Sequence, residues 1–125
     1  MKVWRISSGE CVSTLEGHRE NVSSVCVTAD GEKIVSGGWD NTVKVWNMST
    51  GECVSTLEGH SSIVTCVCVT ADGEKIVSGS WDRTVKVWKI STGECVSTLE
   101  GHRDMVTSVC VTADGEEIIR VTTGQ

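Results

Sequence analysis

The chain has 125 residues, a net charge of −6 and 38% hydrophobic residues, a composition typical of a single globular domain. It has no run of 18 apolar residues, so no segment is expected to span or bind a membrane. An acidic chain without a basic cluster is not expected to bind nucleic acid, because recognition of the phosphate backbone relies on cationic side chains.

The first residues belong to a unit that recurs along the chain. The decapeptide GECVSTLEGH occurs three times at a spacing of 42 residues, beginning at Gly9, Gly51 and Gly93. Of the 42 positions in 9–50, 33 are identical in 51–92. Residues 2–4 (KVW) match residues 44–46, so the chain starts inside a unit. A period of this length predicts an array of one supersecondary unit.

Residues 18–58 predict four short strands separated by turns. The β-branched runs are Val22–Thr28, Lys33–Ser36, Thr42–Trp46 and Glu52–Leu57. None has the length or the 3.6-residue period of a helix. Gly31 follows Ala29-Asp30 and supplies the positive φ that a tight hairpin needs. The unit is therefore expected to be a four-stranded antiparallel meander.

Residues 60–100 repeat this pattern and predict a second meander. A third unit begins at 102–121, and we expect residues 1–16 to supply its two missing strands. Residues 1–125 thus form a single segment of repeats, with the third unit split between the two ends of the chain.

The sequence departs from the repeat after Ile118. Arg120 stands where the period places the equivalent of Ser78, and Gly124 stands where it places the equivalent of Asp82. An arginine buried without a partner would be costly. We therefore expect a frayed or rearranged C-terminus.

These features resemble the WD-repeat β-propeller family, in which Gly-His precedes a strand ending in Trp and each blade has about 40–45 residues. The family's Trp-Asp pair is replaced here by Trp46-Asn47, Trp88-Lys89 and Trp4-Arg5. The resemblance implies an all-β fold of β-propeller blades: three four-stranded antiparallel meanders, one of them split between the termini.

The resemblance also implies a buried hydrogen-bond network in each blade, in which Ser joins the Trp indole to the His and Asp orients the imidazole. The residues concerned are His18, Ser36, Asp40, Trp46, His60, Ser78, Asp82, Trp88, and, for the split blade, His102 and Trp4. Ser, His and Asp also make catalytic triads. A triad repeated every 42 residues, without a nucleophile elbow, is better explained as architecture, and no enzymatic activity is expected.

Three blades are fewer than the four to eight that usually close a propeller. One solution is a homo-oligomer in which terminal half-blades complete each other, giving a six-bladed ring from two chains or a nine-bladed ring from three. Trp4 would then lie near His102 of a neighbouring chain. The other solution is that these residues are part of a longer propeller.

The differences between repeats concentrate in loops that the resemblance places on one rim of the disc. The expected partner-binding residues are Arg19, Asn21, Trp39, Asn41, Ile63, Trp81, Arg83, Arg103 and Met105. A binding surface predicts such variation, and so does neutral drift in solvated loops. Tryptophan is enriched in interface hot spots, which favours a surface role for Trp39 and Trp81, whereas packing against the adjacent blade is the alternative.

The cysteines and the N-terminal residues bear on location and cofactors. Residues 1–10 lack the apolar core of a secretion signal, so a cytoplasmic or nuclear location is expected. The seven cysteines are then expected to be reduced and packed as small apolar side chains. The Cys66-x-Cys68 spacing does not suit zinc, and neither a metal nor a cofactor is expected.

Taken together, the residues and the resemblance predict a non-catalytic scaffold that presents its loop rim to protein or peptide partners. The alternative is a self-assembling ring, or a repeat segment within a larger multidomain sensor protein.

Overall fold

The protein folds into antiparallel β-sheets. The computed structural model describes residues 1–4, 7–18, 20–28, 30–100, 106–111 and 118–122. The strands are β1 Lys2–Trp4, β2 Cys11–Thr14, β3 Val22–Val27, β4 Lys33–Gly38, β5 Thr42–Asn47, β6 Cys53–Glu58, β7 Val64–Val69, β8 Lys75–Ser80, β9 Val85–Lys89, β10 Cys95–Leu99, β11 Val106–Val111 and β12 Ile118–Thr122. Within these residues there is no helix able to cross a bilayer.

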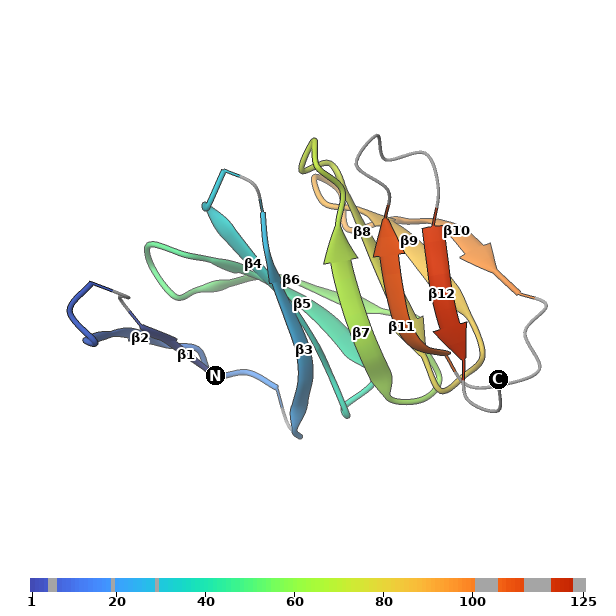
Figure 1. Ribbon diagram of the computed structural model, residues 1–125, viewed down its shortest axis with the longest axis horizontal. Helices are drawn as coiled ribbons and strands as arrows, with labels where there is room; N and C mark the ends of the chain where they lie inside the picture. Colours follow the sequence, from blue (N-terminus) through green and yellow to red (C-terminus); the bar gives the residue numbers. More distant parts are fainter. Residues whose placement is uncertain (5–6, 19, 29, 101–105, 112–117, 123–125) are drawn as a thin grey trace.

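Two complete blades form the centre of the molecule. Strands β3–β6 make one four-stranded sheet and β7–β10 the next, each in sequential order, and the two sheets stand face to face (Figure 1). Gly31 and Gly73 both have φ +73°, which confirms the predicted hairpin turns. The all-β fold built from four-stranded antiparallel blades is therefore confirmed.

The strands expected to make up the split blade form two separate two-stranded sheets. Strand β1 pairs with β2, and β11 pairs with β12. Figure 1 shows the first pair at one end of the arc, next to the β3–β6 sheet, and the second pair at the other end, beside β7. Within one chain the two half-blades therefore do not meet.

The C-terminal strand keeps the register of the repeat. Position 121 lies opposite Ser108, just as Gly79 lies opposite Cys66 and Gly37 lies opposite Ser24. The expected rearrangement is thus wrong for Ile118–Thr122. The physical reason is that four of these five residues are β-branched and fit a pleated strand, whatever their fit to the repeat.

The exposure of the cysteines differs in part from the expectation. Cys66 is buried, and its burial raises the pKa of the thiol. Cys11, Cys53 and Cys95, by contrast, are exposed. The prediction that cysteines pack as small apolar side chains is therefore wrong for these three, because β2, β6 and β10 are edge strands of their sheets and leave the cysteine side chains in solvent.

Candidate interaction rim and its supporting network

In the second blade, four side chains form a continuous hydrogen-bond chain. The Trp88 indole N–H donates to Ser78 Oγ over 2.8 Å. Ser78 Oγ lies 2.7 Å from His60 Nε2, and His60 Nδ1 lies 2.8 Å from Asp82 Oδ2. Trp88 and Ser78 are fully buried, and the His60 side chain is 1% exposed. The chain links the core strand β9 to the turn between β8 and β9.

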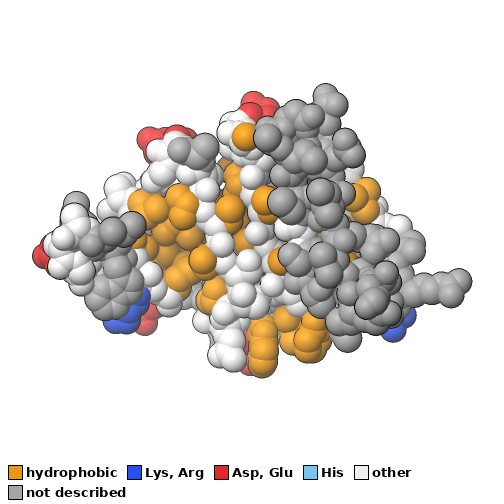
Figure 2. Space-filling view, in the orientation of Figure 1, with side chains coloured by type: hydrophobic (Ala, Val, Ile, Leu, Met, Phe, Trp, Pro, Cys, Tyr) orange, Lys and Arg blue, Asp and Glu red, His pale blue; other side chains and the backbone are white. Residues whose placement is uncertain are grey.

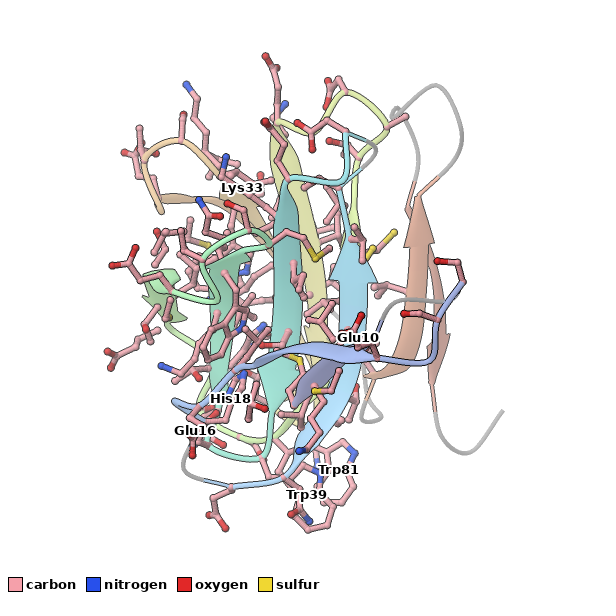
Figure 3. The ribbon with its side chains drawn as sticks, turned by 90° about the vertical axis from the view of Figure 1, so that its left-hand side faces the viewer. Glu10, Glu16, His18, Lys33, Trp39 and Trp81 are labelled. Carbon is pink, nitrogen blue, oxygen red and sulfur yellow. The ribbon has the colours of Figure 1, made fainter. Side chains whose placement is uncertain are left out.

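The first blade has the same chain. Trp46 Nε1 donates to Ser36 Oγ over 2.8 Å, and Ser36 Oγ lies 2.6 Å from His18 Nε2. His18 Nδ1 lies 3.0 Å from Asp40 Oδ2. Figure 3 shows His18 at the end of the sheet from which the β4–β5 turn projects.

The electrostatics of the second blade favour a neutral imidazole beside a charged carboxylate. Burial lowers the pKa of His60, and the neighbouring Asp82 offsets only part of this effect. Burial also acts to raise the pKa of Asp82, but hydrogen bonds from Thr84 and His60 outweigh it and leave the pKa below its ordinary value. His60 therefore carries its proton on Nδ1, donates it to Asp82, and accepts from the Ser78 hydroxyl at Nε2.

This arrangement holds a loop and does not expose a nucleophile. Ser36 and Ser78 have no exposed surface, so a substrate cannot reach either hydroxyl. Each hydroxyl also receives an indole N–H, which occupies a lone pair that a reacting serine would use. Within the described residues, no group of three or more His, Cys, Asp or Glu side chains is gathered as a metal site.

Sequence reasoning missed two further members of the network. Thr42 donates through its hydroxyl to Asp40 over 2.8 Å, and Thr84 donates to Asp82 over 2.6 Å. A Thr two residues after the Asp in both repeats was the available signal.

The glycine of each Gly-His pair also has a role that sequence reasoning did not identify. A Cβ built on Gly17 would lie 2.9 Å from the Trp46 ring, and one on Gly59 would lie 3.0 Å from the Trp88 ring. These glycines make room for the tryptophan that anchors each network.

Backbone hydrogen bonds bring together loops that are far apart in the sequence. The Trp39 N–H donates to the Asn21 carbonyl over 2.8 Å, and the Trp81 N–H donates to the Ile63 carbonyl over 3.0 Å. The network Asp lies next to each Trp, so the buried chain fixes the turn that carries it. We call six residues of these loops the interaction rim: Asn21, Trp39, Asn41, Ile63, Trp81 and Arg83.

Both rim tryptophans are exposed. Trp39 is 46% and Trp81 41% accessible, and both project from the same end of the blades (Figure 3). Asn41 and Arg83 occupy the same turn position, with φ +70° and +72°. Arg19, His102, Arg103 and Met105, and the side chain of Trp4, lie outside what the structure describes.

Comparison with known proteins connects the three repeats to one family. The family model described as "WD domain, G-beta repeat" matches residues 9–47, 51–89 and 93–124. These three ranges cover most of the chain.

Similarity to individual proteins extends over about one repeat. The chain is 44% identical over 43 residues to a ribosome biogenesis protein WDR12 homolog of Drosophila mojavensis, covering 33% of this chain and 10% of that protein. It is 43% identical over 44 residues to guanine nucleotide-binding protein subunit beta-5b of Danio rerio, covering 35% and 11%. A periodic tryptophan protein 2 homolog of Schizosaccharomyces pombe is 38% identical over 42 residues, covering 34% and 5%. The matched region is thus about a tenth or less of each relative.

Proposed function

The chain belongs to the WD-repeat family, and from this premise we propose that its interaction rim binds protein or peptide partners, so that the protein acts as a non-catalytic interaction scaffold. One observation carries the proposal: two exposed tryptophans occupy equivalent positions on successive blades, each held in place by a buried network. Tryptophans presented on a rigid support lose little entropy on binding, which makes them effective anchors.

The backbone of the second rim turn adds support. Arg83 adopts a positive φ, where an arginine is less favourable than the Asn41 of the preceding repeat. Residues held in such conformations concentrate at functional loops. A contact between the guanidinium and a partner offsets this conformational cost. Trp81 and Arg83, two residues apart, suit a partner segment with one apolar and one acidic side chain.

The relatives are consistent with a role inside assemblies. One of them is named as a subunit of a guanine nucleotide-binding protein and another as a ribosome biogenesis protein. A cytoplasmic or nuclear location is part of the proposal, and imaging of the tagged protein tests it.

The rim is tested with matched variants in a quantitative capture experiment. The W39S/W81S chain loses both rim anchors, and the V54S/V96S chain loses two valines of similar exposure on the outer strands β6 and β10. We expect proteins captured by the parent chain to be lost from the rim variant and kept by the control. Equal loss from both variants, or no loss from the rim variant, would contradict the rim assignment.

A further inference from the structure

A groove between the two complete blades lies at the end of the molecule opposite the interaction rim. It has a volume of about 480 Å³ and is lined by the start of β4, by β6 and by the turns that follow β7 and β9. Figure 3 shows Lys33, which lines the groove, at the far end of β4 from Trp39 of the rim. All the lining residues belong to these two blades, so the groove is a feature of the interface between them.

The turn after β5 in the first blade shows what this kind of turn binds. Asn47 Oδ1 accepts hydrogen bonds from the Ser49 N–H over 2.9 Å, from the Ser49 hydroxyl over 2.7 Å and from the Thr50 N–H over 3.2 Å. Successive N–H groups that converge in this way bind an oxygen atom. We call these three groups, and their equivalents in the second blade, the turn donors.

The second blade has the same turn without its acceptor. Lys89 stands where the first blade has Asn47, and Ser91 and Thr92 follow it at the same spacing. The Gly93 N–H donates to the Lys89 carbonyl over 2.8 Å, so the backbone of the turn is closed as in the first blade. A lysine side chain has no acceptor, and among the described residues none accepts from the turn donors of Ser91 and Thr92. These donors are therefore open to an oxygen from another molecule.

The same change of residue gathers positive charge at the groove. Lys89 is exposed and lies directly opposite Lys75 in the β8–β9 register. The first blade pairs Lys33 with Asn47 at these positions. Like charges in opposite positions repel each other, so the second blade has an unfavourable pair that the first blade lacks.

The charge of the groove differs from that of the rest of the chain. Two of its lining residues are lysines, Lys33 and Lys89, and one is an acid, Glu74. The chain as a whole has a net charge of −6, and Figure 2 shows Asp and Glu side chains at the upper end of the blades. The lysines therefore form a cationic site in acidic surroundings, and its charge is complementary to a carboxylate.

We propose that this groove binds an aspartate or glutamate side chain from an acidic segment of a partner protein. One carboxylate oxygen takes the place that Asn47 Oδ1 has in the first blade, and accepts from the turn donors of Ser91 and Thr92. Its negative charge is attracted by Lys89 and relieves the repulsion from Lys75. A carboxylate has the planar shape of the asparagine amide, which a tetrahedral phosphate lacks, and this favours an acidic segment over a phosphorylated one.

The experiment measures peptide binding at the turn itself. The isotope-labelled chain is titrated in an NMR experiment with a short blocked peptide that has one aspartate between apolar residues, and with the same peptide carrying asparagine instead. We expect the aspartate peptide to shift the amide signals of Ser91 and Thr92. Those of Ser49 and Thr50 should stay unchanged, because the Asn47 oxygen already occupies the turn of the first blade. The asparagine peptide should bind at least about tenfold more weakly, because hydrogen bonds to a charged group are stronger.

Three variants assign the binding to this turn. Lys89→Asn gives the second blade the residue of the first, so the new side chain should occupy the turn donors and weaken binding at least about tenfold. Lys89→Met removes the charge but leaves the turn donors open, so it should weaken binding less. Lys44→Asn removes the same charge from a lysine that does not line the groove, and should bind within about twofold of the parent. Thermal unfolding establishes that each variant is folded.

The site is separate from the interaction rim, so the W39S/W81S chain should bind the peptide as the parent does. A loss of binding in that chain would overturn the proposal. So would equal binding of the two peptides, no shift of the Ser91 and Thr92 amides at millimolar peptide, or weakening by Lys89→Asn that matches either Lys44→Asn or Lys89→Met. Tighter binding of a peptide with phosphoserine in place of the aspartate would assign the groove to phosphorylated segments and would also overturn it.

Discussion

At the scale of single residues, the buried polar chain from tryptophan to aspartate is satisfied at every step. Each donor in Trp88, Ser78 and His60 has one acceptor in the second blade. Such a network stabilises only while it is complete, because a buried polar group without its partner has a hydrogen bond neither to protein nor to water.

Removing the Ser78 hydroxyl is therefore expected to destabilise the protein. The Ser78→Ala variant leaves the Trp88 N–H without an acceptor and His60 Nε2 without a donor. We expect the free energy of unfolding in urea to fall by about 1–3 kcal/mol. Ser97→Ala, at an exposed position of β10, is the control and should match the parent. Equal midpoints for both variants would argue against a stabilising role for the network.

Stability should also fall as the solution is acidified. The pKa of folded His60 lies below its ordinary value of 6.5 because the ring is buried. Above that pH the ring is neutral in both states. Below it, the unfolded chain binds a proton that the folded chain resists, so unfolding becomes more favourable.

We expect the parent chain to lose stability between pH 7.5 and pH 5.5 in urea titrations. The His60→Gln variant should be less stable at pH 7.5 and should lose less on acidification. An identical loss in parent and variant would contradict the assignment of this pH dependence to His60.

At the scale of elements, the β8–β9 turn has the same backbone geometry as the β4–β5 turn, but it carries a residue that is unfavourable in this geometry. Its counterpart between β4 and β5 has Asn41 at the same positive φ that Arg83 adopts. Asparagine tolerates the left-handed region better than arginine. The turn geometry is thus shared between the repeats, whereas its conformational cost is not.

The Arg83→Asn variant is accordingly expected to be more stable than the parent by up to about 1 kcal/mol. Thermal unfolding measures the gain, and Arg83→Lys serves as the control that keeps the charge and the strain. A midpoint for Arg83→Asn at or below that of the parent would show that the turn is not strained by its arginine.

At the scale of the whole molecule, the blades depend on one another. The same valine column is buried where a neighbouring blade covers it and exposed where none of the described strands does. Packing between neighbouring sheets, more than hydrogen bonding within a sheet, determines how much each position contributes to the free energy of unfolding.

A pair of identical substitutions tests this. Val67→Ala should lower the free energy of unfolding by about 1–3 kcal/mol, because it leaves a cavity between the two complete blades. Val25→Ala, one repeat earlier, should change it by less than about 0.5 kcal/mol. Similar losses from both substitutions would mean that the first blade's face is covered in solution.

The sequence by itself determined the local architecture. A period of 42 residues, β-branched runs and Asp-Gly turns were sufficient to predict each strand of the two complete blades to within a few residues. Backbone periodicity and turn chemistry are local properties, so they can be read without knowing the neighbours.

Only the tertiary structure decided which side chains of a column are exposed. Val25 and Val67 are the same residue in the same strand of the repeat, and neighbouring sheets alone distinguish them. It also showed that Gly37 lies directly against Val64 and Val67 of the next blade. Thr42 was likewise found to complete the network around Asp40. These contacts join positions on different strands and sheets, and their distances follow from packing, which a repeat pattern does not specify.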